Sequence, residues 1–134
     1  MGEDSLVDRM KSEGEKLINE LPARGFPVEA GFWIQPSEDH QWYFYLISPE
    51  AEDDKLAAAY QKLHTAVRRM SDIVQINPLE IKLIGPDDSL AKAVVAVHRK
   101  FPGRLPLQYG QGGRNLSGIS IDRAYFYPLP VAAV

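Results

Sequence analysis

The sequence contains no cysteine and no long hydrophobic run. The first absence excludes disulfide bonds, thiol nucleophiles and thiolate metal sites, and it is compatible with the cytoplasmic location that we expect. The second excludes a membrane-spanning helix, which needs ~18 consecutive apolar residues. The first ten residues are acidic and lack the apolar segment of a secretory signal, so we expect no contact with a membrane.

Histidine is scarce, with three in the chain: His40, His64 and His98. They form no H-x-x-x-H or H-E-x-x-H pattern, so the sequence predicts no metal site and no cofactor. His40 follows two acids in a polar turn, where such residues are expected. His64 and His98 each flank an apolar helix stripe, and we expect both to be partly buried and hydrogen-bonded.

The chain also lacks a large excess of either charge, because its net charge is only −3. Nucleic-acid-binding domains are usually basic overall, which argues against that partner. The charges are nevertheless uneven: residues 1–60 carry 13 acids and 5 bases (net −8), and residues 61–134 carry 5 acids and 10 bases (net +5). The simpler interpretation is that the two halves fold against each other. The alternative is an anion- or nucleic-acid-binding face made of Arg99, Lys100, Arg104 and Arg114.

Hydrophobic periodicity predicts a single compact α+β domain over residues 1–134. Three amphipathic helices are expected on a mixed or antiparallel sheet of four to six strands, in the order α-β-β-α-β-α-β-β. Gly14 falls on the apolar face of the first helix, which favours a close crossing with another element. The predicted helices span 5–21, 51–70 and 86–101; the strands span 28–35, 42–48, part of 77–85, 104–110 and 118–128; residues 1–4 and 129–134 are expected to be loose termini.

The strand WYFYLI at 42–47 is apolar on both faces, so it must lie centrally with both faces at least partly covered. If all three helices pack on one side of the sheet, the other side presents large aromatic side chains. Tyr and Trp are enriched in interface cores and ligand platforms. This interpretation predicts a contact surface made of Trp33, Tyr43, Tyr45, Tyr125 and Tyr127. The alternative is that a helix or the C-terminal hairpin covers that side.

The glycine-rich segment GRNLSGIS at 113–120 resembles a phosphate-binding P-loop, but Ile119 stands where the loop needs lysine. The residues that follow, ISIDRAYFY, have strand periodicity, whereas a P-loop leads into a helix. We therefore interpret 111–118 as a loop between strands. The residues that follow this loop, 118–128, are predicted to form either a tight hairpin that turns at Asp122-Arg123 or one bulged strand.

One set of residues leaves catalysis open. Asp87 follows a strand and opens a helix, a junction that holds catalytic carboxylates in many α/β enzymes. Together with His98 and Arg114 it would form a cleft for a small substrate. Helix capping also explains Asp87 and Asp88.

The segments ARGFPV (23–28), EIKLIGPDD (80–88), FPGRLP (101–106) and ISIDRAYFYP resemble small uncharacterised bacterial proteins of about this length. The resemblance covers nearly the whole chain, and its motifs are turns, caps and strand cores. It implies a compact bacterial α+β domain. These proteins have no assigned activity, so no site residue carries over.

The sequence thus favours a small non-enzymatic binding domain of unspecified partner. The leading hypothesis is self-association as a homodimer through the aromatic sheet face. The alternatives are the anion or nucleic-acid binder and the enzyme with a cleft near Asp87, His98 and Arg114.

Overall fold

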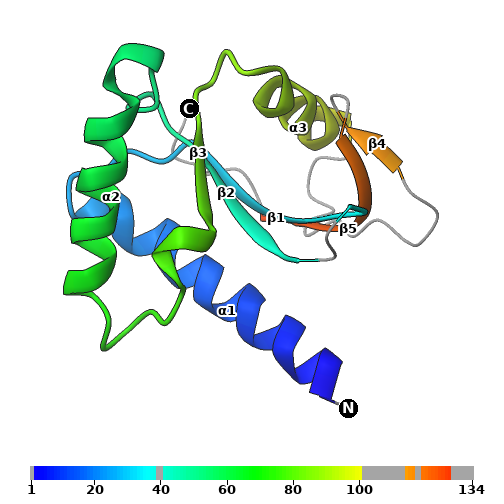
Figure 1. Cartoon of the computed structure of the whole chain (residues 1–134), viewed down its shortest axis with the longest axis horizontal. Helices are drawn as coiled ribbons and strands as arrows, with labels where there is room; N and C mark the ends of the chain where they lie inside the picture. The colour runs from blue at the N-terminus through cyan, green and yellow to red at the C-terminus, as the bar shows by residue number, and fades with distance from the viewer. Residues whose placement is uncertain (1, 39–40, 101–113, 117–118, 128–134) are drawn as a thin grey trace.

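The computed structural model describes residues 2–38, 41–100, 114–116 and 119–127 (Figure 1). Within these ranges three α-helices and five strands follow each other, with two short 3-10 helices between them, and their order matches the predicted one in part. The α+β class is therefore confirmed. The bounds are α1 Gly2–Ala23, β1 Ala30–Pro36, β2 Tyr43–Ile47, a 3-10 helix Asp53–Lys55, α2 Leu56–Arg69, a 3-10 helix Pro78–Glu80, β3 Ile81–Ile84, α3 Ser89–Lys100, β4 Arg114–Leu116 and β5 Ile119–Phe126.

The described strands form one mixed sheet in the order β3-β2-β1-β5-β4. β1 pairs antiparallel with both β2 and β5, β5 pairs antiparallel with β4, and β2 pairs parallel with β3. α2 makes the crossover that a parallel pair requires. β2 is an interior strand, as its two apolar faces predict.

The helices cover both faces of the sheet (Figure 1). α1 and α2 pack on one face, where Leu17 of α1 and Leu63 of α2 share a core with Phe44 of β2. α3 packs on the opposite face, where Val94 shares a second core with Phe32. Because successive side chains of a strand point to opposite faces, β1, β2, β3 and β5 each contribute to both cores.

α1 crosses the sheet closely, and glycine makes this possible on both sides of the contact. A Cβ at Gly14 would overlap Tyr127 Oη and lie 2.8 Å from Trp33 Nε1. A Cβ at Gly31 of β1 would lie 2.6 Å from Ile18 Cδ1 of α1. Real Cβ atoms do not approach this closely, so α1 fits against β1 only without these side chains. The predicted close crossing at Gly14 is confirmed.

Two predictions at the chain ends are corrected. Residues 2–4, expected to be loose, belong to α1. The segment 111–118, expected to be a loop, contains β4, whose three residues pair with β5. Arg114, Asn115 and Leu116 have no alternating apolar pattern, so pairing with a neighbour determines this strand. The predicted strand 104–110 and the predicted loose end 129–134 lie outside the described residues.

β5 runs through Asp122-Arg123 without turning, so the hairpin alternative is wrong and the bulged strand is confirmed. Gln35 pairs with Arg123, whereas the next residue, Pro36, pairs with Ile121. Asp122 is therefore an extra residue on β5. Such a bulge changes the twist of the strand, and it lies where β1 ends.

Candidate functional site

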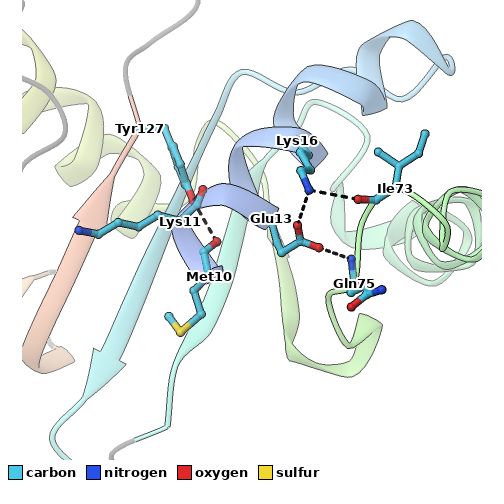
Figure 2. Close-up of polar contacts among 7 residues, drawn as sticks. All are labelled: Met10, Lys11, Glu13, Lys16, Ile73, Gln75 and Tyr127. Carbon is cyan, nitrogen blue, oxygen red and sulfur yellow. Dashed lines mark hydrogen bonds and ion pairs between the residues drawn. The ribbon is translucent and has the colours of Figure 1, made fainter. Parts of the chain in front are cut away.

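The side chains of Trp33 and Tyr127 are part of the interior, with 4% of each residue exposed. Trp33 Nε1 donates a hydrogen bond of 3.0 Å to Tyr127 Oη. The Tyr127 hydroxyl in turn donates to the backbone carbonyl of Lys11 at 2.6 Å, and the Met10 carbonyl lies 3.4 Å away (Figure 2). Every polar atom of this pair has a partner, as buried groups require. We call Trp33, Tyr127 and their contacts with α1 the α1 anchor.

The five aromatic residues predicted to form one surface do not share a face. Trp33 pairs across the strands with Phe44 and Tyr125, on the side that α1 covers. Tyr43 and Tyr45 pair with Ile34 and Phe32, on the side that α3 covers. The alternative interpretation, that a helix covers the aromatic face, is correct for Trp33 and Tyr127, which α1 covers.

Three of the five keep partial exposure. The Tyr45 ring stacks on Phe32 at 5.3 Å between centroids, and the Lys82 ammonium lies 5.2 Å from the Tyr43 ring. The Lys11 ammonium lies over the Tyr125 ring, 4.6 Å from the ring centroid. Burial raises the pKa of the Tyr125 hydroxyl, and the Glu15 charge raises it further. Self-association stays a prediction, and of the five predicted surface residues only Tyr43, Tyr45 and Tyr125 keep exposed area for it.

A second polar contact ties α1 to the segment that follows α2 (Figure 2). The Glu13 carboxylate accepts a hydrogen bond from the Gln75 backbone N–H at 2.6 Å and one from Lys16 Nζ at 2.9 Å. Burial raises the pKa of this carboxyl, but the hydrogen bonds from Lys16 and Gln75 and the nearby positive charges outweigh it, so the pKa lies below its usual value. This contact fixes α1 against the segment that follows α2, and we assign it a structural role.

The residues predicted to bind anions lie at the margin of the described structure. Arg99 and Lys100 end α3 and Arg114 begins β4, but their side chains are not among those described. Arg104 lies outside the described residues. The anion site predicted from these four residues therefore stays a prediction.

The predicted catalytic group spans the length of α3. Asp87 precedes the helix, which begins at Ser89, and His98 lies nine residues into it. At 1.5 Å per residue, Ser89 and His98 are about 14 Å apart along the axis. Asp88, next to Asp87, caps α3 by accepting a hydrogen bond from the Leu90 N–H at 2.9 Å. This separation argues against a constellation of Asp87, His98 and Arg114.

Asp87 and Asp88 do line a cavity of about 540 Å³, where the parallel strands β2 and β3 end. Glu52, Pro49 and Gly85 contribute to its wall. The carboxyl ends of parallel strands are common ligand sites. Within the described residues, however, no three histidine or acidic side chains are placed to hold a metal ion.

A larger cavity, of about 680 Å³, lies along the outer side of α2. Four cationic side chains line it: Lys62, Arg68 and Arg69 from α2, and Arg24 from the turn that follows α1. Among the described residues of its lining, none is acidic. We call this cavity the basic pocket.

The four cations differ in how far other charges neutralise them. Lys62 Nζ pairs with Glu50 at 3.1 Å, and Arg24 pairs with Glu20 at 3.4 Å. Arg68 and Arg69 are exposed and make no ion pair with any residue that the structure describes. Arg68 and Arg69, consecutive residues in the last turn of α2, therefore have no counter-charge among the described residues.

The pocket also contains His64, which is half-buried on α2 and packs against the Tyr60 ring at 5.8 Å between centroids. Its Nε2 is buried and has no hydrogen-bond partner within the described part of the chain. The prediction that His64 is partly buried is confirmed, whereas the predicted hydrogen bond is missing at Nε2. An unpartnered buried nitrogen costs stability.

Sequence reasoning missed this pocket although its signal is present. Gln61, Lys62, Thr65, Arg68 and Arg69 recur at spacings of three and four, so they share the face of α2 opposite to its apolar stripe. Arg68 and Arg69 also lie in the last turn of the helix, where the helix dipole alone explains cations. Arg24 is 38 residues from Lys62 in the sequence, so only the fold reveals that it belongs to the same site.

No family model, curated protein or solved structure matches this chain. The resemblance to small bacterial proteins therefore stays an expectation. None of the helices in the described ranges combines the length and the apolar character that crossing a membrane requires. The chemistry of the basic pocket is therefore the basis for a proposed function.

Proposed function

We propose that this chain is a small binding domain that holds an anionic ligand in the basic pocket. One observation carries the proposal: a cavity of about 680 Å³ is lined by four cations, and none of its described lining residues is acidic. Its volume is in the range of small-molecule sites, about 300–1,000 Å³. This replaces the aromatic sheet face, whose Trp33 and Tyr127 are interior, with a different binding surface.

The chemistry of the lining suits an anion. The planar guanidinium groups of Arg68 and Arg69 present several N–H donors in a fork that matches the oxygens of carboxylate or phosphate. Gln61 and Thr65 add neutral hydrogen-bonding groups to the same wall. The negative end of the α2 dipole opposes an anion near Arg69, so the side-chain charges must supply the attraction.

The proposal is limited to binding. Among the described residues that line the pocket, no hydrogen bond joins a base to a nucleophile, and His64 makes none with the neighbouring Thr65. A cytoplasmic location and a bacterial source agree with this function but are not needed for it.

The test is the affinity for inorganic pyrophosphate, measured by isothermal titration calorimetry on the full chain at low and at high salt. We expect binding at about 50 mM salt that weakens as salt screens the exposed charges. Arg69→Glu should weaken binding about tenfold or more, because it replaces attraction by repulsion at the site. Lys92→Glu is the matched control. It makes the same change of charge at an exposed residue of α3, on the other side of the sheet.

Two results would contradict the proposal. One is the absence of pyrophosphate binding at low salt. The other is an equal loss of affinity in Arg69→Glu and Lys92→Glu, which would show that only the net charge of the chain matters. Far-ultraviolet circular dichroism of both variants checks that they remain folded.

A further inference from the structure

We infer that the ligand of the basic pocket is a small organic phosphate monoester, an inference that rests on the proposed function. Three features of the pocket indicate the class of anion. They are the distribution of unneutralised charge, the shape and polarity of the walls, and the kind of aromatic surface in the lining.

The positive charge of the pocket that no described acidic residue neutralises belongs to the last turn of α2. Arg24 and Lys62 already face Glu20 and Glu50, at 3.4 and 3.1 Å. Arg68 and Arg69 are consecutive in the sequence and form no ion pair with a described residue. About two positive charges at this end of α2 are therefore not neutralised. A phosphate monoester carries nearly two charges at neutral pH on three acceptor oxygens. An extended polyanion instead needs cations distributed along its whole length.

The rest of the pocket has room for an organic body. Its α2 wall runs from Ala58 to Arg69, which is about 16 Å at 1.5 Å per residue. Besides the four cations and His64, the described wall is formed by Ala58, Ala66, Gln61 and Thr65, whereas Phe26 is only 1% exposed. Such a mixed wall leaves room beside the two arginines for a small organic group.

The aromatic groups of the lining are not placed for base stacking. Phe26 is 1% exposed, and the His64 ring lies against Tyr60. Sites for single-stranded nucleic acid need exposed aromatic faces on which successive bases stack. Among the described lining residues no such face is present, which favours a single small ligand over a nucleic-acid strand.

His64 adds a polar group without a described partner to the wall of this pocket. Its ring lines the cavity, and its buried Nε2 has no partner in the part of the chain that the structure describes. Buried polar groups without partners are rare in native proteins, and an ordered water or a bound ion is a common explanation for them.

The experiment compares probes that share a shape or a charge. Binding of phenyl phosphate, benzenesulfonate, inorganic phosphate and a ten-nucleotide oligothymidine to the full chain is measured by titration calorimetry at one salt concentration. Phenyl phosphate and benzenesulfonate share the ring and a tetrahedral head group but differ by one charge. We expect phenyl phosphate to bind about tenfold more tightly than benzenesulfonate, because charge-assisted hydrogen bonds scale with the charge on the acceptor. It should also bind more tightly than inorganic phosphate, because only the ester has an organic body that contacts Ala58 and Ala66.

Variants within the pocket test the charge argument. Arg68→Gln should lower the affinity for phenyl phosphate several-fold more than Lys62→Gln, since Lys62 is neutralised by Glu50 and Arg68 is unpaired. Lys92→Gln on α3 should leave the affinity unchanged. All three positions are exposed, so the variants are expected to fold.

The outcomes separate the two proposals. Equal affinity for phenyl phosphate and benzenesulfonate, or equal affinity for phenyl phosphate and inorganic phosphate, would overturn the monoester while leaving an anion site in place. Preference for oligothymidine that is lost in Arg68→Gln would overturn it in favour of a nucleic-acid strand. Failure of every probe and of pyrophosphate would overturn the anion site itself.

Discussion

The α1 anchor and the basic pocket lie on two helices that pack on the same face of the sheet, yet they satisfy opposite requirements. In the anchor, Trp33 and Tyr127 are 4% exposed and the hydrogen bonds of Trp33 Nε1 and the Tyr127 hydroxyl are made. In the pocket, two guanidinium groups and one buried imidazole nitrogen have no partner among the described residues. A region that is fully satisfied contributes stability, whereas one that keeps unmet charges and hydrogen bonds is suited to a ligand.

The largest expected effect comes from filling the space at Gly14. Gly14→Val places a Cβ that overlaps Tyr127 Oη and lies 2.8 Å from Trp33 Nε1, and neither buried ring has room to retreat. We expect the free energy of unfolding to fall by more than about 3 kcal/mol, because overpacking and two broken hydrogen bonds act together. Urea denaturation measures this change.

Ser12→Val is the control for Gly14→Val, because Ser12 is exposed on the same helix and receives the same β-branched side chain. Its cost should be a few tenths of a kcal/mol, from helix propensity alone. Equal stability of the two variants would mean that α1 does not cross the sheet as closely as the structure has it.

The next effect is the loss of the buried hydroxyl. Tyr127→Phe keeps the ring but leaves Trp33 Nε1 without an acceptor and removes the second hydrogen bond of Lys11 O, at a cost of about 2 kcal/mol. Tyr125→Phe is the control, because its half-buried ring keeps the Lys11 contact. A Tyr127→Phe protein as stable as the Tyr125→Phe protein would show that the anchor's hydrogen bonds contribute nothing.

Tyr127 also makes stability depend on alkaline pH. Burial raises the pKa of its hydroxyl, and the charges of Tyr125 and Glu15 raise it further, against a lowering by the Trp33 hydrogen bond. Because the folded pKa exceeds the unfolded value of 10.0, this contribution is complete below pH 10 and is lost as the pH rises beyond it. The wild type should therefore lose its advantage over Tyr127→Phe above that pH, in thermal unfolding measured across the range.

A smaller effect is expected at Glu13, where α1 contacts the segment after α2. Glu13→Gln keeps an oxygen for the Gln75 N–H but removes the charge paired with Lys16, at a cost of about 1 kcal/mol at pH 7. The folded pKa of Glu13 lies below its unfolded value of 4.5, so its contribution is present above that pH and is lost as the pH falls through the folded pKa. Wild type and variant should converge as the pH falls below the folded pKa of Glu13. A difference that persists there would assign the effect to packing, with the exposed Glu15→Gln as the control.

The comparison also separates what the sequence could predict from what it could not. The element order and the role of Gly14 follow from local periodicity, because the apolar stripe of a helix and the alternation of a strand are short-range patterns. The register of β1 against β2 and β5 is a long-range property. It decides that Trp33 lies beside Phe44 and Tyr125 and not beside Tyr45, so the predicted aromatic surface was assembled from residues of two different faces.

The pocket could be predicted only in part, for the same reason. The basic face of α2 is visible in the spacing of Lys62, Arg68 and Arg69, but the helix dipole explains the last two without any ligand. The contribution of Arg24 and the missing partner of His64 depend on how the turn after α1 packs against α2. The strand β4 shows the same limit, because its pairing with β5 overrides a sequence without strand periodicity.

The smallest expected effect, and the sharpest contrast with the anchor, is at His64. His64→Phe keeps a ring against Tyr60 and removes a buried nitrogen that has no partner among the described residues. Replacing an unsatisfied polar group by an apolar one of similar shape is neutral or stabilising, so we expect the free energy of unfolding to stay the same or to rise by up to about 1 kcal/mol. The same variant should bind phenyl phosphate less tightly. His64→Ala, which loses the ring contact as well, should be less stable than His64→Phe. A His64→Phe protein destabilised by as much as Tyr127→Phe would mean that the imidazole is as well satisfied as the anchor, and the contrast between the two regions would not hold.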